Sequence, residues 1–198
     1  MIATGRSSRG TVARFTGALL AVAVILGMAG SPASATNFGS TGTPGTDGIT
    51  NGVWFTPDRF WNVGLMSLEP DRNLPALRAS VEDDYNVTDL DAFAITGSCA
   101  AASHDACVFD TPYGRNGVNG WNACAGTVSG SHPNQTCSLS YVRLNQTYTW
   151  DVNNLACHEL GHAVGLRHST ETSSCMFAAA SPATITTTHD RGHLNTRY

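Results

Sequence analysis

The sequence predicts a mixed α/β domain, of the α+β kind, built on a twisted and mostly parallel sheet. Short runs that alternate apolar and polar residues, typical of strands, recur between residues 52 and 144. Two longer segments, residues 74–86 and 152–165, have helical spacing, and the first of them interrupts the strand-like runs. Strands that alternate with helices usually form a sheet of mostly parallel strands with the helices packed on it.

The first half of this domain is predicted to contain a strand, a helix and two more strands. The helix is indicated by Leu77, Val81 and Tyr85, which recur at every fourth position, and Pro75 suits its first turn. The predicted strands are residues 52–56, 90–95 and 106–109.

The second half is predicted to contain two strands and two helices. Residues 110–120 are rich in turn-forming residues, and predicted strands follow at 121–128 and 139–144. Asp151 is a candidate N-cap for the helix at 152–165, and residues 184–198 are predicted to form a closing C-terminal helix.

Residues 1–35 have the features of a secretory signal peptide: three arginines, a short apolar run and the cleavage site Ala33-Ser34-Ala35. The alternative, an uncleaved anchor, is disfavoured because the run at 15–30 is short for a membrane span. We therefore expect a secreted, extracellular protein, with a flexible lead over residues 36–51 and one folded domain over residues 52–198.

The charge of the chain bears on its partners. The sequence has 11 basic and 15 acidic residues, and removal of three arginines with the signal peptide lowers the formal charge from −4 to −7. Such a charge argues against nucleic acid or anionic membranes as partners. We expect no stable membrane association after cleavage, and a monomer is the default.

Residues 157–168, CHELGHAVGLRH, carry the pattern H-E-x-x-H-x-x-G-x-x-H. His158 and His162 lie one turn apart on one helix face, so both can reach one metal ion. His168 can supply a third ligand if the chain turns back at Gly165, because glycine adopts positive φ without steric cost. Glu159 follows the first ligand and can be directed at a water on that metal. The alternative is a helix whose histidines only pack or face solvent.

These residues resemble the metzincin zinc endopeptidases, whose signature is this motif followed by a Met-turn. Met176 is the Met-turn candidate, and the resemblance implies an apolar floor beneath the metal. The serine directly after the third histidine, Ser169, is similar to the residue usual at this place in the matrixin branch. The resemblance is to secreted members of bacterial type. Ala178 stands where other branches have a tyrosine ligand, so no further protein ligand is expected.

Six cysteines, all beyond the signal peptide, fit an oxidising compartment. Fifteen pairings are possible for six cysteines, and neighbour spacing favours Cys99–Cys107 and Cys124–Cys137. In the metzincin fold the segments around Cys157 and Cys175 meet below the zinc, so the resemblance implies a bridge between them. Thiolate metal ligation is the alternative, but the spacing matches no Cys-rich zinc pattern.

The resemblance implies a zinc-dependent endopeptidase that cleaves protein or peptide substrates with a zinc-bound water activated by Glu159. One catalytic Zn²⁺ is expected rather than iron, because all three candidate ligands are histidines. A Ca²⁺ ion or other structural ion near the turn-rich loop is a further candidate, with ligands among His104, Asp105, Asp110 and His132. The small residues after Met176 are expected to border a roomy substrate pocket.

Two alternatives to this function remain open. One is a non-catalytic or very narrow relative that keeps the metal and holds peptides in its cleft, although the retained Glu159 argues against it. The other is a cell-wall hydrolase, against which no wall-binding module is visible. A second motif-like run, His189 to His193, lacks a third ligand and has a shorter acid, so ordinary helix-surface or packing contacts are expected for it.

Overall fold

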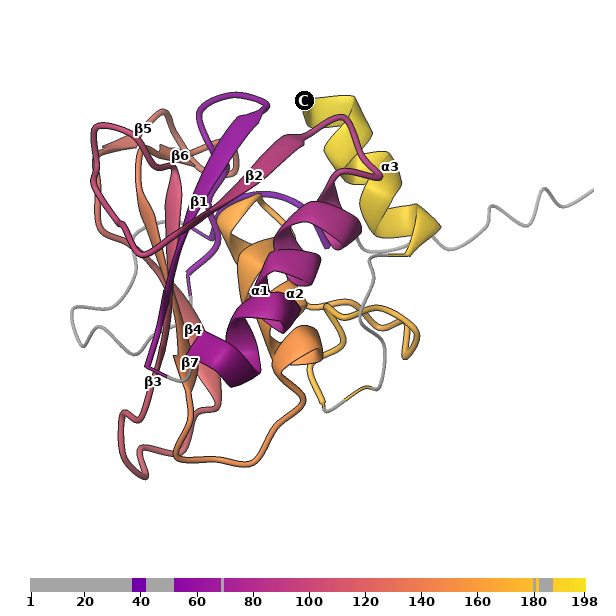
Figure 1. The fold of residues 1–198 in the computed structure, drawn as a ribbon. Helices are drawn as coiled ribbons and strands as arrows, with labels where there is room; N and C mark the ends of the chain where they lie inside the picture. The colour runs from indigo at the N-terminus through magenta and orange to yellow at the C-terminus, as the bar shows by residue number, and fades with distance from the viewer. Residues whose placement is uncertain (1–36, 42–51, 69, 180, 182–186) are drawn as a thin grey trace, which may run out of the picture. The chain divides into compact units, whose positions relative to one another are not determined.

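The computed structural model describes residues 37–41, 52–68, 70–179, 181 and 187–198, shown as the coloured ribbon in Figure 1. The predicted signal peptide and most of the predicted lead lie outside these residues. Residues 37–41 are the exception, since Asn37 and Ser40 are buried against the folded domain. This part of the expected flexible lead is therefore held in place.

A five-stranded sheet with the strand order β2-β1-β3-β7-β4 forms one layer of the structure (Figure 1). Its first four strands are parallel, and β4 pairs antiparallel with β7, which confirms the predicted mixed and mostly parallel sheet. The strands are β1 (Phe60–Ser67), β2 (Asp91–Thr96), β3 (Ala106–Thr111), β4 (Gly120–Cys124) and β7 (Ser140–Asn145). A small antiparallel pair consists of β5 (Val128–Ser129) and β6 (Thr136–Cys137).

The strand expected at residues 52–56 is wrong, and the strand β1 was missed. Residues 52–56 are extended but make only one isolated bridge, from Phe55 to Thr136. The sheet instead uses β1, whose side chains Trp61, Val63 and Leu65 alternate into the core. The sequence contains this alternation, but Asn62 and Gly64 separate the three apolar residues, so no continuous apolar run marks the strand.

Helices α1 (Pro70–Tyr85) and α2 (Val152–Ala163) lie side by side on one face of the sheet (Figure 1). α1 begins four residues earlier than expected, so Pro75 lies inside the helix rather than in its first turn. Leu77, Val81 and Tyr85 of α1 are fully buried in the core that both helices share with the sheet. The C-terminal helix α3 (Thr188–Arg197) confirms the predicted closing helix.

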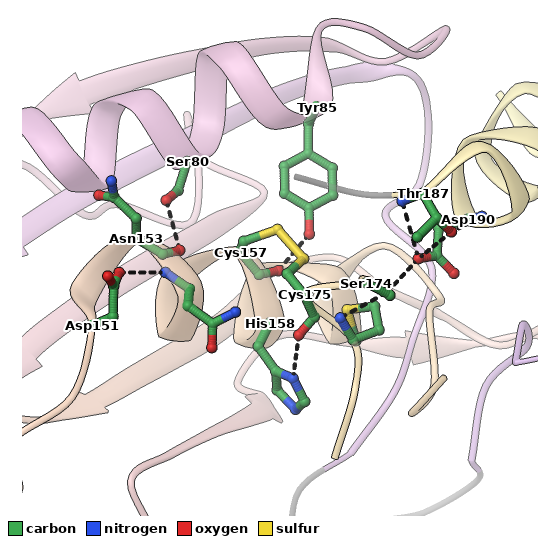
Figure 2. The surroundings of a disulfide bond; sticks show 12 residues. Ser80, Tyr85, Asp151, Asn153, Cys157, His158, Ser174, Cys175, Thr187 and Asp190 are labelled. Atoms are coloured by element: carbon green, nitrogen blue, oxygen red, sulfur yellow. Dashed lines mark hydrogen bonds between the residues drawn. A yellow bond between two sulfur atoms is a disulfide. The ribbon is translucent and has the colours of Figure 1, made fainter. Parts of the chain in front are cut away.

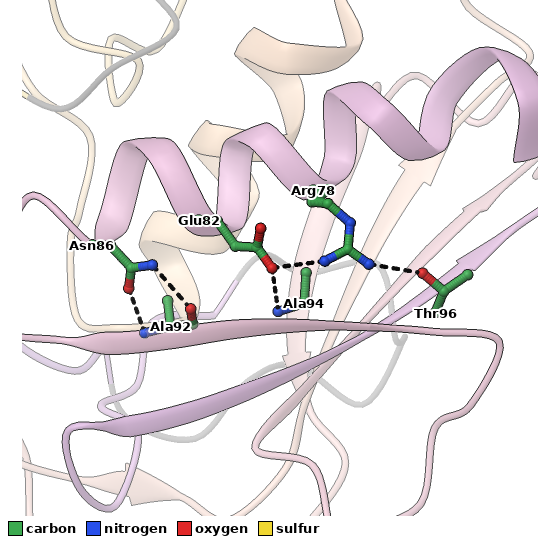
Figure 3. Close-up of polar contacts among 6 residues, drawn as sticks. All are labelled: Arg78, Glu82, Asn86, Ala92, Ala94 and Thr96. Carbon is green, nitrogen blue, oxygen red and sulfur yellow. Dashed lines mark hydrogen bonds and ion pairs between the residues drawn. The ribbon is translucent and has the colours of Figure 1, made fainter.

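Side chains of α1 and of Asn86, the residue directly after it, occupy the outer edge of β2 (Figure 3). Asn86 donates to the carbonyl of Ala92 and accepts from its N–H, at 3.1 and 2.6 Å. Glu82 accepts from the N–H of Ala94 at 3.2 Å and pairs with Arg78 at 2.7 Å. Since free strand edges recruit other strands, these contacts block this edge of the sheet.

Candidate active site

Helix α2 carries two of the three candidate ligands, His158 and His162, and its start is fixed by two contacts. The Asp151 carboxylate caps the helix by accepting from the N–H of Asn154 at 3.0 Å. The Ser80 hydroxyl of α1 donates to the carbonyl of Asn153 at 3.1 Å (Figure 2). The helix therefore begins in a defined position relative to α1.

The chain reverses at Gly165, directly after α2. Gly165 has a φ of 97°, in the left-handed region that glycine adopts most easily. A Cβ atom at this position would also lie 2.3 Å from the Phe55 ring. The turn brings His168 back toward the helix, next to His158 and His162.

The three histidine rings converge on one point. Their ring centroids are 4.8, 5.0 and 5.1 Å apart, and one nitrogen from each ring lies within 4.8 Å of the others. Within the described residues, His158, His162 and His168 form the only cluster of three or more side chains suited to a metal ion. The structure thus brings together the three ligands expected from the motif.

Two backbone carbonyls orient the helical histidines. Nδ1 of His158 lies 2.7 Å from the carbonyl oxygen of Cys175, and Nδ1 of His162 lies 2.8 Å from that of Leu166. A carbonyl only accepts, so each Nδ1 carries the proton and each Nε2 presents a lone pair. Nε2 of His162 is buried and has no hydrogen-bond partner among the described residues, which fits a metal ion at this point.

Burial also keeps these rings neutral. Desolvation lowers the pKa of His158 to about 4, lowers the pKa of His162 well below its ordinary value, and lowers the pKa of His168. Neutral imidazole is the form that binds a metal. Three neutral imidazoles with one position left open are the donor set of a catalytic zinc site.

Glu159 borders the same cavity as the ligands. The cavity is about 310 Å³ in volume and is lined by His158, Glu159 and His168 together with residues of three other segments. These are Val118–Gly120 before and at the start of β4, then Trp150, Asn154 and Leu155 just before and within the start of α2, and residues 177–179 after Met176. Glu159 is only 3% exposed, so its carboxylate is largely shielded from bulk water.

Met176 is fully buried against α2. A Cβ at Gly161 would collide with the Met176 sulfur, so only glycine allows this approach. The Met176 carbonyl accepts from the N–H of Ser169 at 2.8 Å, which ties Met176 to the residue after His168. Gly161 was missed in the sequence, although a glycine inside a helix is a signal of close packing.

The disulfide Cys157–Cys175 joins α2 to the segment that carries Met176 (Figure 2). The Tyr85 hydroxyl donates to the carbonyl of Cys157 at 2.6 Å, so α1 supports the same point. The other two disulfides, Cys99–Cys107 and Cys124–Cys137, are also the pairs expected from the sequence.

Asp190 of α3 is a structural residue of this region, for which the sequence predicted ordinary helix-surface or packing contacts, and the structure shows packing contacts. It is fully buried and accepts from the Ser174 hydroxyl at 2.6 Å and from the Asn37 side-chain amide at 2.8 Å. It also forms a capping box with Thr187 at the start of α3. The Thr-x-x-Asp spacing was the signal that could have identified it. Asp190 therefore links α3, the N-terminal segment and the residues before Met176.

Three of the four side chains considered for a structural ion have other partners, and the fourth, His132, is exposed. Asp110 accepts from Ser67 and Asn73, and Asp105 accepts from the N–H of Asn62. His104 contacts Ser98 and Ser103. They form no cluster of three metal ligands in the part of the chain that the structure describes, and nothing indicates calcium there.

Comparison with known proteins agrees with this geometry. No curated protein gives a significant match to the chain. The sequence model described as Matrixin matches residues 39–194, which include all the described strands, helices α1 and α2, most of α3 and the three histidines. The chain therefore belongs to the matrixin family, the metzincin branch whose members are zinc metallopeptidases.

Proposed function

We propose that the protein is a secreted zinc endopeptidase with Glu159 as its general base and His158, His162 and His168 as its zinc ligands. The observation that carries the proposal is the cavity in which two of the three clustered histidines, His158 and His168, lie beside the shielded carboxylate of Glu159. Family membership supports the metallopeptidase class, and the residue roles are our assignment.

The chain's own residues account for the proton transfers. When bound, zinc supplies Lewis acidity that lowers the pKa of a water molecule and polarises a peptide carbonyl. The Glu159 carboxylate accepts the proton of the attacking water and then delivers it to the leaving amine. The Cys175 and Leu166 carbonyls hold the ligand rings in place during this cycle, because each accepts an Nδ1–H.

We infer that an extended peptide binds beside the start of β4, at Gly120, because Gly52 already occupies the outer side of this strand at Asn122. The carbonyl of Asn122 points away from β7, since it accepts from the N–H of Gly52 at 2.9 Å. Backbone groups alternate along a strand, so those of Gly120 point the same way and border the cavity. Ala178 and Ala179 line the cavity with small side chains, which leaves room for a substrate side chain.

Secretion is part of the proposal. Three disulfides suit an oxidising compartment, and no helix among the described residues is long and apolar enough to cross a membrane. The predicted signal peptide at residues 1–35 agrees with export. We expect the protein to act as a monomer on extracellular protein substrates.

The test is casein hydrolysis by residues 36–198 and by the Glu159→Ala variant, at matched zinc content. We expect activity that a chelator abolishes, and loss of this activity in the variant. Glu171→Ala is the matched control, because Glu171 is an exposed glutamate that does not line the cavity. Equal activity in Glu159→Ala and wild type would refute the role of Glu159. If wild type and Glu159→Ala both bind zinc and peptide but neither hydrolyses casein, the alternative of a non-catalytic peptide-binding protein is favoured.

A further inference from the structure

Helix α3 contains a second pair of facing histidines. His189 and His193 lie one turn apart, and their Nε2 atoms are 3.3 Å from each other. Their ring centroids are 4.6 Å apart with an interplanar angle of 77°. The candidate zinc ligands His158 and His162 have nearly the same arrangement, with values of 4.8 Å and 88°.

The distance between the two Nε2 atoms suits a shared cation. Two Zn–N bonds of about 2.0–2.1 Å at a tetrahedral angle place their nitrogen atoms roughly 3.3 Å apart. In the metal-free protein, one ring donates its Nε2–H to the other. If the donor ring takes the tautomer with its proton on Nδ1, both Nε2 lone pairs become available, and a divalent cation can bond to both of them.

The surroundings favour such binding. The Phe38 ring stacks on His193, with centroids 4.9 Å apart and planes 8° from parallel, and so holds one ligand in place. Burial and the neighbouring His189 lower the pKa of His193, which keeps this imidazole neutral. His189 and His193 are both only partly buried, so water molecules can complete the coordination shell.

We propose that His189 and His193 form a second metal site, for a late first-row transition-metal cation such as Cu²⁺, Ni²⁺ or Zn²⁺. Asp190 is not a third ligand, because its carboxylate faces inward to Ser174 and Asn37. With two protein ligands, the site binds more weakly than the histidine triad, and affinity follows the order Cu²⁺ above Ni²⁺. A bound cation would join the first two turns of α3, the helix whose Asp190 supports the residues before Met176.

The test uses the purified protein with one equivalent of zinc already bound, titrated with Ni²⁺ by calorimetry at neutral pH. We expect one further equivalent of Ni²⁺ with no release of zinc. His189→Gln and His193→Gln should each lose this equivalent, whereas His132→Gln, a change at an exposed histidine outside α3, should keep it. The copper-loaded protein should show two nitrogen ligands by electron paramagnetic resonance.

Each variant must keep its first equivalent of zinc, which shows that it is folded. If His193→Gln does not fold because its contact with Phe38 is lost, His189→Gln alone decides the result. The proposal is overturned if wild type takes up no further Ni²⁺, if both variants keep the second equivalent, or if Ni²⁺ enters by displacing zinc. None of these outcomes depends on peptidase activity.

Discussion

Removal of the Cys157–Cys175 disulfide should weaken zinc binding, whereas removal of a disulfide away from the site should not. The perturbation is the double change Cys157→Ala and Cys175→Ala, compared with Cys99→Ala and Cys107→Ala. The first bridge joins the residue before His158 to the residue whose carbonyl orients His158. The comparison bridge closes a loop between β2 and β3 that does not line the cavity.

Chain entropy predicts similar losses of folding stability for the two double variants. The sequence separations are 18 residues for the first bridge and 8 for the second. Loop closure then accounts for about 3 and about 2.5 kcal/mol of unfolding free energy, respectively. Stability alone therefore cannot distinguish the two bridges, but zinc affinity can.

Zinc affinity should fall about tenfold in the first variant, the lower end of the range for lost support of a metal ligand. It should stay unchanged in the second. Denaturant unfolding measures the stability loss, and competition with a chelator under native conditions measures the zinc dissociation constant. Equal zinc affinity in both variants, at comparable losses of stability, would refute the view that this bridge positions His158.

Three further changes test other parts of the structure. Gly161→Ala should lower the unfolding free energy by about 1–3 kcal/mol and weaken zinc binding, because the new Cβ collides with Met176. An unchanged melting temperature by calorimetry together with an unchanged zinc affinity would contradict this prediction. Asn145→Ala should lower kcat/KM at unchanged zinc content, because the Asn145 amide donates to the carbonyl of Val118 at the cavity wall. Steady-state kinetics with a peptide substrate measure kcat/KM. Burial raises the pKa of the Asp84 carboxyl group to about 7, so the folded protein binds the proton of this group more tightly than the unfolded chain does. The unfolding free energy should therefore fall as the pH rises from about 4 to 7. Asp84→Asn should flatten that part of the stability–pH curve, measured by denaturant unfolding.

The sequence predicted the elements whose signals are local. The amphipathic spacing of Leu77, Val81 and Tyr85 identified α1, and the motif at 157–168 identified the three histidines that the structure brings together. β1 was missed because it has no continuous apolar run. Its burial comes from its place between β2 and β3 in the sheet. The extended segment at 52–56 has the apolar residues of a strand, and these are buried, but it makes only one isolated bridge and contacts both the end of α2 and strands β4 and β6.

The support of the histidines was harder to predict, because it comes from segments far apart in the chain. The amide of Asn37 reaches Asp190 across 153 positions, and no local pattern records such a contact. Tyr85 supports the carbonyl of Cys157 across 72 positions. Three rings on a free helix and loop would not keep their lone pairs on one point, since exposed side chains change rotamer freely. The H-E-x-x-H-x-x-G-x-x-H pattern therefore predicts which residues bind, whereas the rigidity of the site depends on contacts that only the fold supplies.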